Sequence, residues 1–209
     1  MPGRLRRRRG LNGFRRSEDG IAILEFALVL PILLLSYFGT IEVSNLLGSL
    51  RKVDLLTRTL GEFVGAVPTP SQQEVDGMLK ASKVVLMPLD ATKAEIVVSA
   101  VGVVGTDAQA PMRICSSIAG ANATPRRPGD TSPVAIPDDQ RIAGARMLLI
   151  ETRLRYQPLS GTIFTSLFGR VLGNIVFQRQ IYWPVSAGLR YHSQAPEIVL
   201  AGGLPCPAP

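Results

Sequence analysis

The hydrophobic pattern of the chain changes character near residue 42. From Ile21 onward the sequence is apolar on every side, and no charged residue lies between Glu25 and Glu42. This run is about 20 residues long, the length that a helix needs to cross the roughly 30 Å hydrocarbon core of a bilayer. The pattern therefore predicts a transmembrane helix over residues 21–42.

Beyond this run, apolar residues recur at steps of three and four positions, with charged residues between them. The spacing predicts that the same helix continues to about residue 66, with one face buried against a soluble domain. The helix is expected to stop before the Pro68-Thr-Pro70 segment. Ser71 and Glu74 then match a capping box, which predicts the start of a second helix.

Period-two alternation and β-branched residues predict the strands. They fall over residues 94–104, 146–156 and 175–185, with a further short candidate over 113–116. In the segment 146–156, Glu151, Arg153 and Arg155 share one side, so a half-buried strand with a charged outer face is expected. The fold class is therefore α+β, with a long N-terminal transmembrane helix continuing into a small soluble domain that holds a mostly antiparallel sheet.

The remaining segments give weaker signals. Residues 117–140 are rich in Pro, Gly, Ala, Asp and Arg, which is typical of a long loop. Residues 162–172 carry apolar side chains at helical spacing. They are expected to form either a short helix packed in the core or an apolar patch lying on the membrane. The Pro- and Gly-rich tail after His192 is expected to be irregular.

Charge separates the chain into three parts. The net charge is +7, and residues 1–20 carry most of it, with seven arginines against two acids. The basicity therefore belongs to the terminus and not to a face of the domain, which argues against nucleic acid as a partner. By the positive-inside rule, residues 1–20 form a basic cytoplasmic leader, 21–42 the membrane helix and 43–209 an extracytoplasmic α+β domain.

Three other interpretations of the N-terminus compete with an uncleaved or leader-cleaved membrane helix. A cleaved secretory signal needs a shorter apolar core and a small-residue site after it, which the sequence Ser-Tyr-Phe-Gly-Thr after Leu35 does not supply. A twin-arginine signal rests only on the arginine run, which many basic leaders share. A buried core helix fits neither the length nor the basic flank.

Glu25 is the one carboxylate near the start of the apolar run. On insertion scales, an acid at the helix centre costs about 2.5–3.5 kcal/mol, and less near the interface. Glu25 either sits among the lipid headgroups without a partner or is paired. If a peptidase cuts after Gly20, the new α-amine of Ile21 lies about one helical turn away. The amine of a neighbouring subunit can then neutralise the carboxylate and set the register between packed helices.

The sequence GIAILEF, from Gly20 to Phe26, resembles the prepilin processing site of tight-adherence (Flp-type) pilus systems. With its basic leader and apolar helix, the segment is similar to the N-terminal signature of TadE-like pseudopilins. Residues 148–159 (LLIETRLRYQPL) look like a late segment often seen in TadE-like domains. The resemblance implies cleavage by a prepilin peptidase between Gly20 and Ile21. It also implies that Glu25, with Phe26, acts in assembly.

A minor pilin-like subunit of a tight-adherence pilus is the function that the resemblance implies. It would act in pilus assembly, surface adhesion and biofilm formation. Its partners would be the prepilin peptidase, other pilin-like subunits, the secretion platform and the inner membrane. The protein would cross that membrane once, with its C-terminal domain in the periplasm or in an extracellular pilus. The alternative is a signal-anchored periplasmic binding domain that does not polymerise.

The sequence shows few candidates for chemistry. Cys115 and Cys206 fit no zinc or redox motif, and in an extracytoplasmic domain they either form a disulfide or remain as two thiols. There is a single histidine, His192, so no metal site is expected. The chain contains no phosphate loop, dinucleotide fingerprint, zinc-protease motif or nucleophile elbow. We therefore expect no cofactor and no enzymatic activity.

Overall fold

The structure is a computed structural model. It describes residues 19–67, 70–87, 89–107, 110–134, 136, 141–158, 174–185, 188–191, 193–194, 196–200 and 202–208. The chain divides into two compact units, one ending at Ser44 and the other beginning at Asn45. Residues 162–172, expected to form either a short helix or an apolar patch on the membrane, lie outside the described residues.

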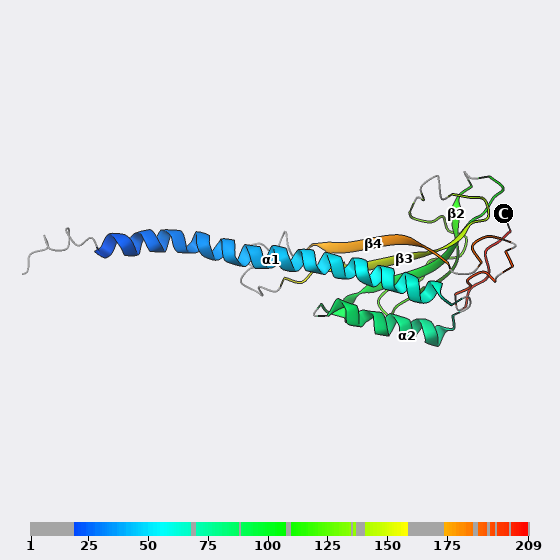
Figure 1. The fold of residues 1–209 in the computed structure, drawn as a ribbon, viewed down its shortest axis with the longest axis horizontal. Helices are drawn as coiled ribbons and strands as arrows, with labels where there is room; N and C mark the ends of the chain where they lie inside the picture. Colours follow the sequence, from blue (N-terminus) through cyan, green and yellow to red (C-terminus); the bar gives the residue numbers. More distant parts are fainter. Residues whose placement is uncertain are drawn as a thin grey trace, which may run out of the picture. The chain divides into compact units, whose positions relative to one another are not determined.

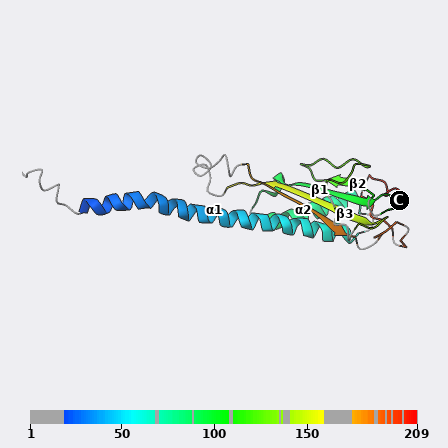
Figure 2. The same ribbon diagram turned by 90° about the horizontal axis from the view of Figure 1, so that it is seen from above.

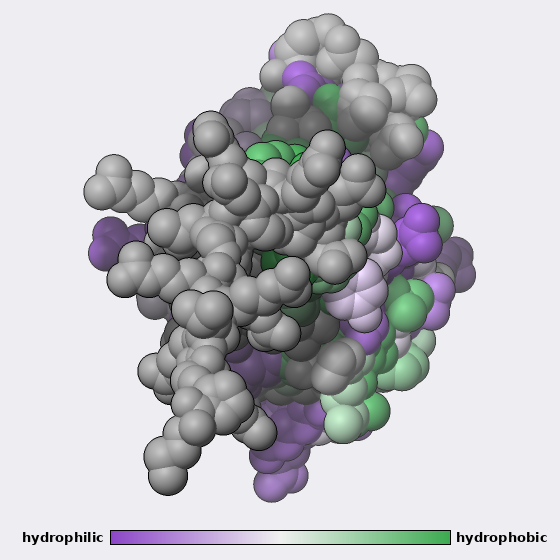
Figure 3. Space-filling view, turned by 90° about the vertical axis from the view of Figure 1, so that its left-hand side faces the viewer, coloured by the Kyte–Doolittle hydropathy of each residue, from purple (hydrophilic) through white to green (hydrophobic). Residues whose placement is uncertain are grey.

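Helix α1 (Asp19–Gly65) is 47 residues long and contributes to both units (Figures 1 and 2). In the first unit its large apolar side chains are exposed, as with Ile23 at 71% and Leu28 at 69%. Seen from the side at which α1 begins, the residues shown in colour include both hydrophobic and hydrophilic ones (Figure 3). The prediction of one helix from about residue 21 to about residue 66 is confirmed.

Helix α2 (Gln72–Ser82) begins at the predicted capping box. The backbone N–H and the hydroxyl of Ser71 both donate to Glu74 Oε2 at 2.8 Å, and the N–H of Glu74 donates back to Ser71 Oγ at 3.3 Å. These bonds satisfy donors that a helix start leaves free, and they hold the pKa of Glu74 below its ordinary value. Two short 3₁₀ helices follow, η2 (Lys83–Leu86) and η3 (Ala91–Lys93).

A four-stranded antiparallel sheet completes the second unit. Its order is β2-β1-β3-β4, and its strands are β1 (Glu95–Val103), β2 (Met112–Ala119), β3 (Arg146–Arg155) and β4 (Val176–Pro184). The α+β class is confirmed. The short strand expected over 113–116 is longer than predicted and takes in the first residues of the expected loop 117–140.

The main core lies between one face of the sheet and the helices α1 and α2 (Figures 1 and 2). It combines a helical stripe with inward-facing strand residues, among them Val53, Leu56, Leu60, Val64, Val75, Leu79, Ile96, Val98, Leu148 and Ile150. Each such side chain gains roughly 1.5–3 kcal/mol from burial. Trp183 of β4 packs directly on α1, where Gly61 and Gly65 leave room for its ring.

Among the described residues, the opposite face of the sheet has a smaller cover than the core face. A smaller apolar cluster occupies one end of it, built from Val101, Val103, Ala110, Met112, Ile114, Ile136, Ala145 and Leu149. The hydroxyl of Tyr182 contacts this cover through Ser132 Oγ at 2.7 Å and through the carbonyl of Val134. Burial raises the pKa of Tyr182. At its other end, this face carries a polar hollow.

Candidate functional site

The predicted processing motif lies in the first turns of α1. The helix begins at Asp19, so the Gly20–Ile21 bond is within its first turn. Ile21 and Glu25 are four positions apart and therefore share one face of the helix. Both side chains are exposed, as is Phe26 at 61%. Within the described part of the chain, no cation forms a salt bridge with Glu25, which leaves its carboxylate accessible to a group outside this chain.

The two cysteines meet although 91 residues separate them. Cys115 in β2 and Cys206 near the C-terminus form a disulfide, with their Cα atoms 4.8 Å apart. Closing so long a loop restricts the unfolded chain, and disulfides typically contribute about 2–4 kcal/mol. The irregular C-terminal segment is thereby fixed to an edge strand of the sheet.

A buried ion pair holds the same C-terminal segment. Arg146 of β3 is 4% exposed, and its Nε donates to Glu197 Oε1 at 3.0 Å. Its Nη2 donates to the carbonyl of Pro207 at 3.0 Å, and the N–H of Cys206 donates to the second oxygen of Glu197 at 3.2 Å. Both charges therefore have several partners, the condition under which a buried pair is tolerated.

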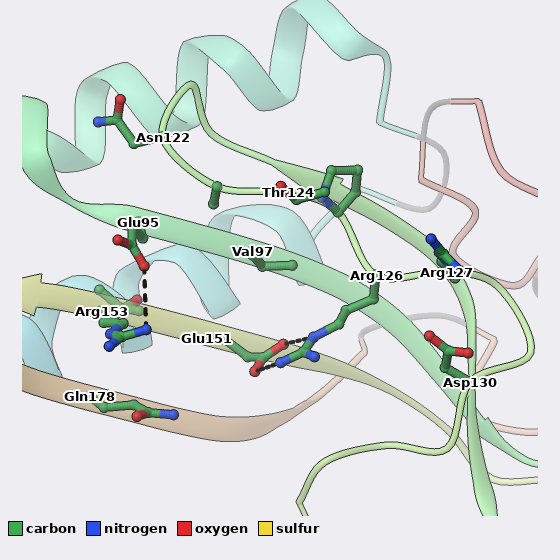
Figure 4. Close-up of a pocket in the computed structure, with 13 residues that line it drawn as sticks. Glu95, Val97, Asn122, Thr124, Arg126, Arg127, Asp130, Glu151, Arg153 and Gln178 are labelled. Atoms are coloured by element: carbon green, nitrogen blue, oxygen red, sulfur yellow. Dashed lines mark hydrogen bonds and ion pairs between the residues drawn. The ribbon is translucent and has the colours of Figure 1, made fainter.

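The polar hollow has a volume of about 600 Å³ and lies on the sheet face away from the helices. Its floor is formed by strand residues such as Val97 and Gln178, and its rim by the loop that follows β2 (Figure 4). Arg126 of this loop donates two hydrogen bonds to the carboxylate of Glu151 in β3, one from Nε at 3.0 Å and one from Nη2 at 2.7 Å. The loop is thus held over the face by a bidentate pair, the strong form of arginine–carboxylate contact.

Charge in the hollow is balanced within the protein. The hydrogen bonds to Glu151 raise the pKa of Arg126, and Gln180 Nε2 donates to the same carboxylate at 2.8 Å. A second, more exposed pair joins Arg153 and Glu95 at 3.9 Å. The arrangement suits a surface that recognises polar groups.

This hollow corrects one sequence prediction. The alternation predicts an exposed Glu151 on a charged outer face, but its side chain is buried, with 9% of the residue exposed. Arg153 and Arg155 are exposed as predicted. No sequence pattern signals the Arg126–Glu151 pair, because Arg126 lies 25 positions away from Glu151 in a loop without periodicity. For the same reason the Arg146–Glu197 pair, 51 positions apart, was missed.

Among the described residues, no group of three or more His, Cys, Asp or Glu side chains is placed to hold a metal ion. Helix α1 is long and apolar enough to cross a membrane, and none of its most apolar stretch is buried. These features define the class: an α+β protein whose N-terminal apolar helix is suited to anchor it in a membrane.

The sequence model of the TadE-like protein family matches residues 20–58. The match begins at Gly20, the glycine of the predicted processing motif, and covers the apolar run with the first turns of the amphipathic stripe. The predicted resemblance to TadE-like proteins of the tight-adherence system is confirmed over this segment. Neither a curated protein nor a solved structure matches the chain.

Proposed function

We propose that this chain is a minor pilin-like subunit of a tight-adherence (Flp-type) pilus, with a structural and not an enzymatic role. It would be processed by a prepilin peptidase after Gly20 and act in pilus assembly, surface adhesion and biofilm formation. The observation that carries the proposal is the TadE-like match over residues 20–58. That match contains an exposed carboxylate, Glu25, at the start of an exposed apolar helix.

Two independent features support an orientation with the second unit outside the cytoplasm. The arginines precede the apolar run, and positively charged flanks stay on the cytoplasmic side. The Cys115–Cys206 disulfide belongs in an oxidising compartment such as the periplasm. Both features support a topology in which residues 45–209 lie across the inner membrane from the leader.

The role proposed for Glu25 follows from its surroundings. A carboxylate in a weakly polar medium needs a counter-charge, and its attraction to one is strong because screening is weak. Removing the leader creates an α-amine at Ile21, about 6 Å along the helix from Glu25. When two processed helices pack side by side, the amine of one can pair with the carboxylate of the other, which fixes their register in the fibre.

Leader cleavage is tested by the substitution Gly20→Leu. In cells with an active prepilin peptidase, the unmodified chain should begin at Ile21, and the variant should keep the mass of the full chain because the bulky side chain blocks the cleavage site. The matched control is Gly39→Leu, at a helix position where nothing lies within 4 Å of an added Cβ; it should be processed normally. Mass spectrometry and N-terminal sequencing of membrane fractions give the result. A native chain that still begins at Met1 would contradict the proposal.

The assembly role is tested by Glu25→Ala. This variant should be cleaved and inserted, yet its abundance in purified fibres should fall at least tenfold, because the paired charge sets the register. Glu62→Ala removes an exposed carboxylate from the same helix far from the motif and should enter fibres normally. Quantitative immunoblots of sheared pili measure both. Normal incorporation of the Glu25 variant would remove this residue from the mechanism.

A second function, that of an anchored envelope-binding domain that never polymerises, draws support from the polar hollow beneath the Arg126 loop. It predicts an uncleaved leader and no co-purification with pilus components. The Gly20 experiment therefore separates the two functions before any ligand is known.

A further inference from the structure

A second cavity continues the polar hollow along the same face of the sheet. It has a volume of about 490 Å³ and shares Glu95, Asn122 and Arg153 with the hollow. Arg155 lines this second cavity and lies two positions beyond Arg153 in β3, so both arginines belong to the outer face of the strand. The two cavities therefore form one trough along this face, which we call the polar trough.

The rim of the polar trough is fixed to the rest of the second unit on both sides of the Arg126 contact. Asn122 donates from Nδ2 to the carbonyl of Thr92 in η3, at the point where the two cavities meet. Near the other end of the rim loop, the N–H of Gly129 donates to the carbonyl of Ile114 in β2 at 2.8 Å. A cavity whose walls are already held in place loses little conformational freedom when it binds a ligand.

Positive charge is in excess along the polar trough. Among the described residues, three carboxylates line the two cavities against five cations, which are Lys93, Arg126, Arg127, Arg153 and Arg155. Three of these cations form salt bridges within the protein. Arg127 and Arg155 are exposed and form no salt bridge with a described residue. Arg127 and Arg153 lie toward opposite ends of the hollow (Figure 4), and Arg155 lies beyond Arg153, so the two unpaired guanidinium groups are at opposite ends of the trough.

The lining of the polar trough suits a polymer that carries both carboxylates and hydroxyls. A guanidinium group matches a carboxylate through two parallel hydrogen bonds. Between the unpaired arginines, Asn122, Thr124 and Gln178 offer neutral donors and acceptors for hydroxyl groups. No aromatic residue lines either cavity among the described residues, whereas single-stranded nucleic acids are bound by stacking their bases on aromatic rings. The lining therefore favours an acidic polysaccharide over a nucleic acid.

We propose that the polar trough binds an acidic polysaccharide. Arg127 and Arg155 each bind a carboxylate of the polymer, one at either end, and the neutral side chains between them bind its hydroxyls. The inference goes beyond the proposed function. It depends on neither cleavage nor membrane insertion nor polymerisation, because every residue that carries it belongs to the second unit.

Calorimetric titration of the full chain in a nonionic detergent tests the ligand class. The probes are a short oligogalacturonate, which has one carboxylate on each sugar, and its methyl ester, which keeps the other hydroxyls but has no charge. The acid should bind about tenfold more tightly than the ester, because two charge-assisted contacts are lost in the ester. It should also bind about tenfold more tightly than the single sugar galacturonate, which cannot occupy both ends. Equal affinities for the acid and the ester would overturn the proposal.

The location of the site is tested by combining Arg127→Gln with Arg155→Gln. The matched control combines Arg51→Gln with Lys80→Gln, which removes two exposed cations from α1 and α2 and changes the net charge equally. The trough variant should lose about tenfold in affinity for the oligogalacturonate, whereas the control should bind like the native chain. An equal loss in the two variants would show that binding follows net charge and would overturn the site.

Competition with single-stranded DNA tests the choice between the two kinds of polymer. DNA of the same number of charges should displace the oligogalacturonate only at about tenfold higher concentration, since the trough provides no ring on which its bases could stack. Equal competition would make the trough a general site for polyanions and overturn its assignment to a polysaccharide. None of these outcomes bears on the Gly20 experiment, so the inference and the proposed function can fail separately.

Discussion

The two parts of α1 share one helical backbone but have opposite surroundings. From Ile21 to Ile41 the side chains are apolar on all sides, and almost all of them are exposed in the isolated chain. From Asn45 to Gly65 one stripe is buried, formed by Val53, Leu56, Leu60 and Val64 with Ser49 and Thr57. The exposed remainder mixes charged residues with apolar ones such as Leu55. A stripe is enough when a sheet covers one side, whereas a helix that is apolar all round requires an apolar medium on every side. The contrast assigns the first part to lipid or to neighbouring helices.

Matched truncations of side chains in the two parts of α1 should show the largest difference between them. Leu56→Ala empties a fully buried position and should lower the free energy of unfolding of the second unit by about 2–5 kcal/mol. Ile32→Ala, at a position 59% exposed, should leave that value unchanged. Denaturation of the full chain in detergent, followed by the fluorescence of the single tryptophan Trp183, measures both. An equal loss from Ile32→Ala would mean that the first part of α1 is packed in the domain core.

Two glycines of α1 should give a smaller difference in stability when each is replaced by alanine. A Cβ at Gly61 would lie 2.6 Å from the ring of Trp183, whereas nothing lies within 4 Å of a Cβ at Gly48. Gly61→Ala should therefore destabilise by about 1–3 kcal/mol through overpacking, and shift the tryptophan emission. Gly48→Ala should stabilise by up to about 1 kcal/mol, since alanine favours the helix. If both substitutions raised the free energy of unfolding, helix propensity and not the contact with Trp183 would control position 61.

Local pattern was sufficient for most of the fold. The two-part helix, the capping box at Ser71 and three of the strands follow from periodicity and short-range hydrogen bonding, which a single sequence displays. Strand β2 was underestimated because Arg113, Ser116 and Ser117 interrupt its alternation. Ser116 is buried nevertheless, since its hydroxyl accepts a hydrogen bond from the N–H of Leu200 at 3.1 Å.

The candidate sites divide in the same way. The predicted processing motif is contiguous in sequence, so Gly20, Ile21, Glu25 and Phe26 can be proposed from the sequence alone, and their roles stay predictions. The polar hollow depends on the ion pair between Arg126, a loop residue, and Glu151 of β3. The attachment of the C-terminal segment depends on the ion pair between Glu197 and Arg146. Such charge pairs are set by the tertiary fold, and no spacing along the chain signals them. The sequence left the pairing of Cys115 and Cys206 open for the same reason.

The smallest predicted effect concerns the ion pair between Asp54, in the second part of α1, and Arg179 of the sheet. Arg179 of β4 donates from Nε to Asp54 Oδ1 at 2.6 Å, and Arg58 donates to Oδ2 at 2.9 Å. The hydrogen bond from Arg179 is the main reason that the pKa of Asp54 lies below its ordinary value of 3.8. Because Arg179 is 52% exposed, solvent screens the pair, and Asp54→Asn should cost less than about 1 kcal/mol at neutral pH.

The sign of the pH dependence makes this small effect testable. A carboxyl group whose pKa is lower in the folded than in the unfolded state stabilises the fold fully above the unfolded value, and this contribution disappears as the pH falls through the folded value. The difference in unfolding free energy between the native chain and Asp54→Asn should therefore shrink toward zero below about pH 4. Glu62→Gln, which removes an exposed carboxylate of α1 with no salt bridge in the described residues, controls for the change in net charge. A difference that stays constant between pH 7 and pH 3 would mean that side-chain shape at position 54, and not its ionisation, holds this part of α1 against β4.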